Sequence, residues 1–311
     1  MAGERRRAEA GAPRTARNSE SPLLTQLVMS FAEVCKAPRY TPTTASGYLQ
    51  RLQALIGWAE SKKVTRAAHV TYSVMQSFIA ERTAEGVAGS TINRDIQVLR
   101  TCFKHARRQQ LIPTDPFVTE DFRALKLREP RPKPSALTLS PGQIDLALVT
   151  ATRLCTKPVA ALLQFTAGSG VRASEAMHIE ASDVRILDAS AGLAVLTIGP
   201  KPGWTTKGYR YRDVPISKRT ADAALEFIAT KNDAPTDPKT VWLQLKIVAK
   251  EAGVPNFSMH DLRRAWASAM HFNGATMKQV SVWLGHADVQ TTERYVRVFD
   301  TGKTGHEFLP R

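Results

Sequence analysis

Cysteine is scarce in this sequence, with three residues among 311. Cys35, Cys102 and Cys155 lie far apart and form no CxxC pair, so neither a disulfide framework nor a cysteine zinc site is predicted. The GxxxxGK[ST] phosphate loop and the HExxH helix are absent as well. These absences disfavour NTP hydrolysis and zinc peptidase chemistry.

Long apolar runs are also missing. No stretch approaches the roughly 20 consecutive apolar residues that a bilayer crossing needs, and the longest, at 159–171, is interrupted by Gln164 and Gly168. The N-terminal residues carry charges but no apolar h-region, so no secretory signal is expected. The sequence therefore predicts no membrane span and a cytoplasmic protein.

Negative charge is the third deficit. Asp and Glu number 28 against 43 Lys and Arg, which gives a formal net charge of +15 and a pI near 10. A charge of this sign and size favours a polyanionic partner, with nucleic acid ahead of a membrane surface. The hydrophobic content of 43% is ordinary for globular proteins, and the length suggests about two domains.

The chain is expected to have four parts. Residues 1–20 place arginines among Ala, Gly and Pro and predict a basic flexible arm, because this composition builds no core. Residues 21–115 carry apolar residues at helical spacing and predict a helical domain. A basic, proline-rich linker is expected at 116–136, followed by a mixed domain at 137–311.

The fold class expected is mainly α with a small antiparallel β-sheet. Four helices are predicted in the first domain, with breaks near Pro42, Thr71 and Gly89. In the second domain, strands are predicted at 193–198 and 209–216, joined by the long basic segment GPKPGWTTKG. Helices are predicted around these strands at 144–154, 160–165, 221–230, 240–252, 261–272 and 277–284.

Four stretches combine phosphate-binding groups with apolar helix residues: GSGVRASE, TKGYRYRDVPI, MHDLRRAW and LGHADVQTTERY. Arg172 and Glu175 stand three apart and share a helix face, where the carboxylate can orient the guanidinium. His260 and Arg263 repeat this spacing. Two oriented arginines can grip a phosphate bidentately and offset the charge of a pentacoordinate transition state, a task for which lysine is a poor substitute.

In this order, the residues resemble the signature of the tyrosine recombinase (phage integrase) family. Lys207 lies eight residues before Pro215, and the Tyr of TTERY follows the His of LGH by nine residues, as in the family's motifs. The resemblance covers about residues 21–298, as a core-binding domain followed by a catalytic domain. The catalytic residues that it implies are Arg172, Lys207, His260, Arg263, His286 and Tyr295.

The resemblance implies a nucleophile, a base and an acid. Tyr295 would attack the scissile phosphodiester and form a 3′-phosphotyrosyl intermediate. A free tyrosine has a pKa of about 10, so His260 is expected to act as its base. Lys207 would protonate the departing 5′-oxygen as the general acid, and Lys201 is the rival for this role because either ammonium could reach the site.

The remaining site residues would bind the phosphate or support the groups that bind it. Arg172 and Arg263 would hold the non-bridging oxygens, and His286 would donate a further hydrogen bond. Glu175 and Asp183 are expected to orient these groups, or else to be helix caps or surface ion pairs. The resemblance implies that neither a cofactor nor a metal is needed.

The expected function is site-specific DNA recombination or integration by a homotetramer on double-stranded DNA, in a bacterial or phage-encoded, nucleoid-associated protein. An accessory directionality factor would leave no mark in this sequence. The alternatives are a type IB topoisomerase-like strand-passage enzyme and a non-catalytic DNA-binding derivative. Residues expected to contact DNA are Arg94, Arg100, Lys104, Arg107, Arg108 and Lys201.

Overall fold

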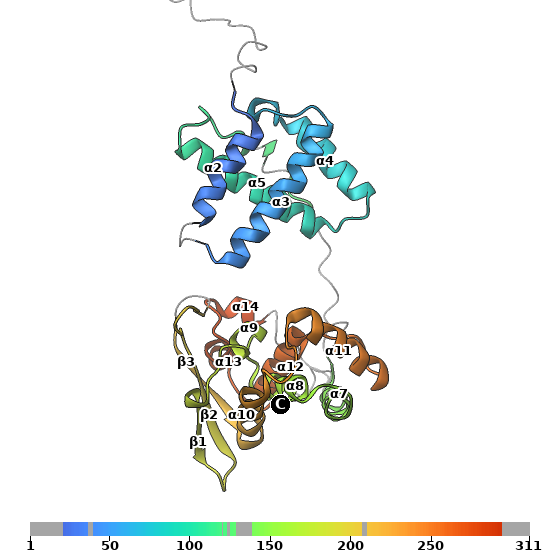
Figure 1. Cartoon of the computed structure of the whole chain (residues 1–311), viewed down its shortest axis with the longest axis vertical. Helices are drawn as coiled ribbons and strands as arrows, with labels where there is room; N and C mark the ends of the chain where they lie inside the picture. Colours follow the sequence, from blue (N-terminus) through green and yellow to red (C-terminus); the bar gives the residue numbers. More distant parts are fainter. Residues whose placement is uncertain are drawn as a thin grey trace, which may run out of the picture. The chain divides into compact units, whose positions relative to one another are not determined.

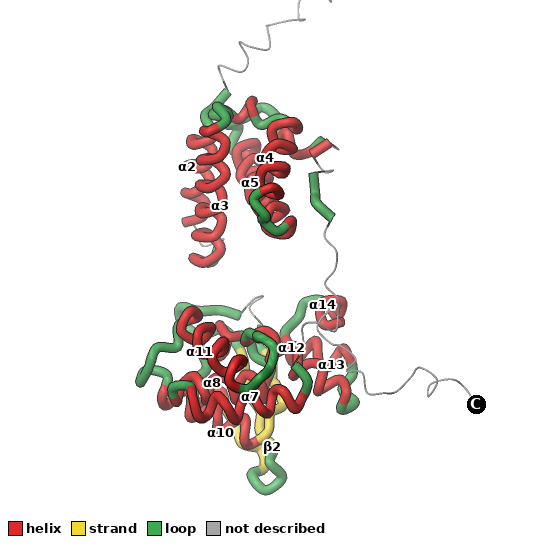
Figure 2. The backbone as a smooth tube through the Cα atoms, turned by 90° about the vertical axis from the view of Figure 1, so that its right-hand side faces the viewer, coloured by secondary structure: helices red, strands yellow, loops and turns green. Residues whose placement is uncertain are grey.

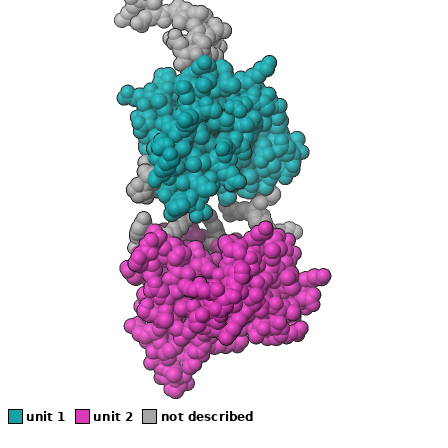
Figure 3. Space-filling view, in the orientation of Figure 1, with its two compact units in different colours: residues 1–131 teal, residues 132–311 magenta. Residues whose placement is uncertain are grey.

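A computed structural model describes residues 21–36, 40–119, 121–122, 125–128, 139–206 and 210–293. The chain divides into two compact units at residues 131 and 132, coloured separately in Figure 3. The expected arm at 1–20, residues 129–136 of the expected linker with the two residues that follow, and the tail from residue 294 lie outside the described residues.

The first unit is helical. Thr41 and Thr71 each accept a hydrogen bond from a backbone N–H in the first turn of the helix that follows, which places two of the expected breaks. The third break is confirmed by the helix that begins at Gly89. In the described part of the chain, the four expected helices are α2 (Leu24–Lys36), α3 (Pro42–Ser61), α4 (Tyr72–Ala84) and α5 (Gly89–Arg108), with 3₁₀ turns η1 (Ala67–His69) and η2 (Pro116–Val118).

The core of the first unit extends past residue 115. Ile92 and Phe103 of α5 are buried, as the helical spacing predicts. Phe117, Phe122 and Leu125, in the segment expected as a linker, are buried in the same cluster. The three phenylalanine rings pack edge-on, with ring centroids 5.3 Å apart for Phe103 and Phe117 and 4.8 Å apart for Phe117 and Phe122. The start of this segment therefore belongs to the helical unit.

The second unit contains a three-stranded antiparallel sheet in the order β1-β2-β3, which lies to one side of the helices (Figure 1). Leu196 in the central strand pairs with Val184 and Val214. The first strand was not expected, because it is an edge strand with mostly exposed side chains and no alternation of polar and apolar residues. The strands are β1 (Val184–Asp188), β2 (Leu193–Ile198) and β3 (Arg212–Ser217).

Helices make up the rest of this unit, and the strands, yellow in Figure 2, are few beside them. The central helix α8 buries Val159, Leu162 and Phe165. The helices are α7 (Pro141–Leu154), α8 (Lys157–Ser169), α9 (Ala173–Ala176), α10 (Lys218–Thr230), α11 (Pro238–Glu251), α12 (Met259–Phe272), α13 (Met277–Leu284) and α14 (Val289–Glu293), with the 3₁₀ turn η4 (Ala181–Asp183). The expected class, mainly α with a small antiparallel sheet, is confirmed. None of the described helices is long and apolar enough to cross a bilayer.

Candidate active site

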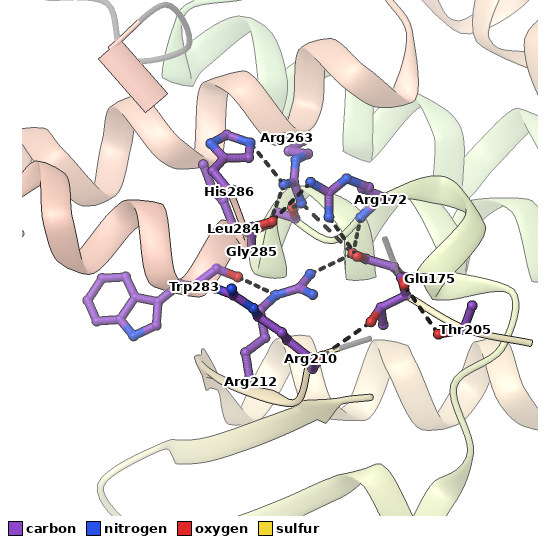
Figure 4. Close-up of polar contacts among 12 residues, drawn as sticks. Arg172, Glu175, Thr205, Arg210, Arg212, Arg263, Trp283, Leu284, Gly285 and His286 are labelled. Atoms are coloured by element: carbon purple, nitrogen blue, oxygen red, sulfur yellow. Dashed lines mark hydrogen bonds and ion pairs between the residues drawn. The ribbon is translucent and has the colours of Figure 1, made fainter. Parts of the chain in front are cut away.

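A buried carboxylate, Glu175, is surrounded by guanidinium groups from three elements (Figure 4). Its Oε1 lies 2.8 Å from Nη1 of Arg172, and its Oε2 lies 2.6 Å from Nη2 of Arg212 and 3.9 Å from Nη1 of Arg263. The backbone N–H of Arg172 also donates to Oε2, at 2.8 Å. The side chain of Glu175 is 2% exposed. One carboxylate thus holds three arginines in fixed orientations.

Two glycines at helix ends shape this cluster. Gly170 ends α8 with φ +64°, and its carbonyl accepts a hydrogen bond from Nη1 of Arg263 at 2.6 Å. Gly285 ends α13 with the same φ, and its carbonyl accepts from Arg172 at 3.4 Å. A Cβ at Gly170 would lie 2.4 Å from the Trp266 ring. Glycine is therefore required at this position both by the left-handed backbone and by the close packing.

Helix α12 brings His260 and Arg263 to the site. Asp261 accepts hydrogen bonds from the backbone and hydroxyl of Ser258, at 2.9 and 2.7 Å, and so stabilises the start of the helix. Arg263 is 1% exposed, whereas His260 in the first turn is exposed. Both line a cavity of about 620 Å³ together with Arg172. The expected i, i+3 pair therefore meets Arg172 at one cavity.

His286 follows α13 and contacts Arg263. Its Nε2 lies 3.3 Å from Nη2 of Arg263, and its Nδ1 lies 2.8 Å from Oγ1 of Thr292. Because a guanidinium can only donate, this contact makes Nε2 the acceptor and assigns the proton to Nδ1. The same arginine nitrogen donates to the carbonyl of Leu284 at 2.5 Å. His286 is thus held as a neutral imidazole beside the cluster.

The net effect of burial and charge at the site is to lower the pKa of Glu175 and of His286. Burial alone would raise the pKa of Glu175, but the hydrogen bonds and charges of Arg212 and Arg172 outweigh burial and lower it. Burial, followed by the charges of Arg263, Arg172 and Arg212, lowers the pKa of His286 to about 4. Glu175 is therefore ionised and His286 is neutral at pH 7.

Burial and neighbouring charge also lower the pKa of His260. Although His260 is exposed as a residue, partial burial of its imidazole is the largest cause, followed by the charges of Arg264 and Arg263, and the charge of Asp261 opposes them. His260 in turn contributes to the lowered pKa of His286. A neutral imidazole at position 260 can accept a proton near pH 7.

We expect a pH-dependent loss of stability that requires His286. Between the unfolded pKa of about 6.5 and the folded pKa of about 4, the unfolded chain binds the extra proton, so stability falls as pH falls through this window. His286→Gln removes the titrating group. Thermal unfolding at pH 7 and pH 5 should show a smaller decrease in Tm for this variant than for the unsubstituted protein; equal decreases would contradict the prediction.

Not every expected site residue joins the arginine cluster. Tyr295 and Lys207 lie outside the described residues. Asp183 was expected either to orient the phosphate-binding groups or to be a cap or ion pair, and the structure shows the second: its Oδ2 accepts from the backbone N–H of Glu180 at 2.9 Å, and its Oδ1 lies 2.7 Å from Nζ of Lys201. The reason is local: Asp183 is the last residue of η4, the 3₁₀ turn that follows α9 and directly precedes β1. Its partner Lys201 also contacts Glu180, at 3.2 Å.

The basic residues expected to contact DNA in the first unit all lie on α5. Within the described part of the chain, no ion pair engages the four exposed cations among them. Arg100 instead donates to the carbonyl of Phe122 and lies over the Phe117 ring, 5.8 Å from its centroid. The four exposed cations are Arg94, Lys104, Arg107 and Arg108.

Two residues of the site were missed from the sequence. Arg212 on β3 donates to Glu175 and, from Nε, to the carbonyl of Trp283 at 2.7 Å. A signal was present, because strand alternation places Arg212 on the same face as the buried Val214. The other missed residue is Thr292, whose partnership with the imidazole of His286 left no sequence signal.

Metal binding is not indicated by these side chains: among the described residues, no group of three or more His, Cys, Asp and Glu is placed to hold an ion. A second hollow of about 250 Å³ lies beside the cluster and is lined by Thr206, Arg212 and His286 among others. Fixed guanidinium groups and imidazoles thus border both cavities, an arrangement whose chemistry suits an anion.

Comparison with known proteins gives two family matches. Residues 142–301 match the phage integrase family, and residues 31–110 match the N-terminal SAM-like domain of phage integrases. The tyrosine recombinase XerD of Yersinia pestis is 27% identical over 271 residues, which cover 82% of this chain and 86% of the relative. The tyrosine recombinase XerA of Thermococcus onnurineus is 28% identical over 238 residues, covering 71% of this chain and 75% of the relative.

Solved structures share the fold. A Tn1549 transposon integrase in complex with a circular intermediate DNA has a TM-score of 0.69 at 17% identity, covering 93% of this chain and 100% of that one. A lambda integrase dimer bound to a COC′ core site has the same TM-score and identity, covering 94% and 84%. Because the phage integrase match spans half of the sequence and holds the arginine cluster, the chain belongs to the phage integrase family of site-specific tyrosine recombinases.

Proposed function

We propose that the second unit cleaves and rejoins DNA strands through a 3′-phosphotyrosyl link, with Tyr295 as the nucleophile. The observation that carries the proposal is the set of guanidinium groups held by the buried Glu175 beside His260 and His286. Oriented arginines offset the negative charge that a phosphodiester gains on attack. We assign this role to Arg172 and Arg263, whose positions match the family motif.

The two transesterifications exchange one phosphoester for another. Tyr295 Oη attacks phosphorus and loses its proton to His260, while the bond from phosphorus to the 5′-oxygen breaks. The departing 5′-oxygen receives a proton from Lys207. In the reverse step, a 5′-hydroxyl attacks the phosphotyrosyl bond and releases the tyrosine. The bond energy is conserved in the protein–DNA link, and no nucleotide is consumed.

His286 can change its hydrogen-bonding role when a phosphate arrives. In the free protein, Nε2 accepts from Arg263 and Nδ1 donates to Thr292. A phosphate that replaces Nε2 as the partner of Arg263 leaves Nε2 free to carry the proton and to donate to a non-bridging oxygen. The hydroxyl of Thr292 can then donate to Nδ1, since a hydroxyl is both donor and acceptor. A neutral imidazole therefore suffices for this step.

The partner is double-stranded DNA, and the assembly a homotetramer on it. The net charge of +15 and the exposed cations of α5 support DNA binding. Among the structures with the same fold, one is described as a lambda integrase tetramer bound to a Holliday junction. The cations at 94, 104, 107 and 108 span about 21 Å of helix at 1.5 Å per residue, a length suited to tracking several phosphates.

Two alternatives differ from this proposal in outcome. A type IB topoisomerase-like enzyme would relax supercoils without joining partners, and a non-catalytic derivative would bind DNA without cleaving it. The relatives named XerD and XerA are tyrosine recombinases, which supports recombination over relaxation. The polar cluster at 172, 175, 212 and 263 supports catalysis over binding alone, because a binder has no need of buried, oriented phosphate ligands.

The test is covalent trapping. The protein is incubated without metal with nicked suicide duplexes taken from the DNA that flanks its own gene, and the products are separated on denaturing gels. A protein–DNA adduct that resists denaturation supports the proposal, and joining of two duplexes separates recombination from relaxation. Duplexes that are bound but never captured, across all flanking sequences, would overturn it in favour of the binder.

Replacing Arg172 by lysine should slow adduct formation by about 10²-fold, the cost typical of losing one donor to a transition-state oxyanion. Lysine keeps the charge but lacks the planar fork through which Arg172 donates from Nη1 to Glu175 and from Nη2 to the Gly285 carbonyl, so it cannot hold a phosphate oxygen in the same geometry. The measurement is the single-turnover rate of adduct formation at saturating protein. Arg185→Lys in β1 is the matched control, and an equal effect in both variants would contradict the assignment.

A further inference from the structure

The β2–β3 connection is attached to the body of the second unit through the side chain of Lys201. Its Nζ lies 2.7 Å from Asp183 and 3.2 Å from Glu180, and the side chain is only 18% exposed. Asp183 is more buried still, at 12%. Glu180 directly precedes the short turn η4, and Asp183 is the last residue of that turn, directly before β1. An ammonium that donates to two close carboxylates has most of its donors occupied, so it is a poor candidate for binding a DNA phosphate.

A second attachment lies three residues further along. The Trp204 ring stacks on His178, with centroids 4.3 Å apart and planes inclined by 10°. His178 is itself oriented by the carbonyl of Ser174, 2.8 Å from Nδ1. Lys201 and Trp204 also exchange two backbone hydrogen bonds, at 2.9 and 3.0 Å, so the two attachments form one rigid turn. His178 lies three residues after Glu175, which links this turn to the arginine cluster.

The connection is also held where it ends. Thr206 is 3% exposed, and its hydroxyl donates to the carbonyl of Arg210 at 3.2 Å. Arg212 then anchors β3 to Glu175 and to the Trp283 carbonyl (Figure 4). The chain on either side of residues 207–209 is therefore fixed to the elements that carry Arg172 and His286.

We propose that Lys201, paired with Asp183, is a positioning residue that attaches the β2–β3 connection to the body of the unit and does not itself deliver the proton to the 5′-oxygen. The inference rests on the proposed function. The surroundings of Lys201 agree with it: burial alone would lower the pKa of Lys201, but the hydrogen bonds and charges of Asp183 and Glu180 raise it, which makes proton release harder.

The variants at position 201 distinguish attachment from acid catalysis. Lys201→Ala should slow adduct formation by about 10²-fold, as expected when a reacting group is displaced by about an ångström. Lys201→Arg should restore the rate to within a fewfold of the original, because arginine keeps the ion pairs but cannot give up a proton. Asp183→Asn should reproduce the effect of Lys201→Ala, and Lys218→Ala, which removes an exposed ion pair, is the control.

A modified substrate gives the second readout. When sulfur replaces the bridging 5′-oxygen, the leaving thiol has a pKa near 8.5 and departs without an added proton. Lys201→Ala, Asp183→Asn and Lys207→Ala should all cleave this substrate at nearly the rate of the unsubstituted protein, whereas Arg172→Lys should stay slow. The inference is overturned if Lys201→Arg is as slow as Lys201→Ala, or if the sulfur substrate fails to rescue Lys201→Ala. Absence of any adduct from the unsubstituted protein would instead overturn the proposed function.

Discussion

Tyr295→Phe is expected to abolish the covalent protein–DNA adduct while leaving DNA binding unchanged. The substitution removes only the phenolic oxygen, which is the atom that would bond to phosphorus. Loss of a catalytic nucleophile lowers a rate by a factor on the order of 10⁶, so the adduct should fall below detection. Binding is expected to persist because the exposed cations of α5 and the arginine cluster are unchanged.

The measurement pairs a denaturing gel with a native binding titration on the same nicked duplex. Tyr211→Phe is the matched control, since Tyr211 on the β2–β3 connection is 71% exposed and has no assigned role in the chemistry. Adduct formation by the control and not by Tyr295→Phe supports the assignment. An adduct that persists in Tyr295→Phe would mean that another side chain is the nucleophile.

Local patterns were sufficient to predict much of the site. The i, i+3 spacing placed Arg172 against Glu175 within a single turn, and it placed His260 beside Arg263. Helix periodicity and the breaks near Pro42, Thr71 and Gly89 likewise located the helices of the first unit, because both signals act within a few residues of the chain. Such features depend on nearest neighbours and are therefore readable from sequence.

Contacts between distant segments were not predictable in this way. Arg212 meets Glu175 across 37 residues, and Lys201 meets Asp183 across 18. Which carboxylate pairs with which cation depends on how β3 and η4 lie against α9, and this follows from the packing of the whole unit. The sequence therefore left open whether Asp183 orients the phosphate-binding groups or is a cap or ion pair, and the fold brings it to Lys201. Arg212, by contrast, has a charge on the buried face of a strand, a local sign of a buried partner.

Glu175→Gln is expected to destabilise the second unit by about 3–5 kcal/mol, the cost of removing one partner from a buried ion pair. The carboxylate accepts hydrogen bonds from the backbone N–H and the guanidinium of Arg172, and from the guanidinium of Arg212. Glutamine keeps one acceptor oxygen and turns an NH₂ group toward guanidinium donors. The charges of Arg212 and Arg263, 7% and 1% exposed, are then left without a buried anion.

Urea unfolding followed by tryptophan fluorescence measures this loss, because four of the five tryptophans lie in the second unit. Asp222→Asn is the matched control: it removes a carboxylate from the exposed pair with Lys218 and should cost at most about 0.5 kcal/mol. A loss below about 1 kcal/mol for Glu175→Gln would contradict the prediction.

The pH dependence gives a further check on the same carboxylate. Because the folded pKa of Glu175 lies below its ordinary value of 4.5, its contribution to stability is complete above pH 4.5 and is lost as pH falls through the folded pKa. Glu175→Gln should therefore differ most from the unsubstituted protein near neutral pH and least in acid. Since the same carboxylate fixes the guanidinium of Arg172, to which we assign phosphate binding, adduct formation at pH 7 should fall with stability, which ties the fold of this unit to its proposed chemistry through one buried charge.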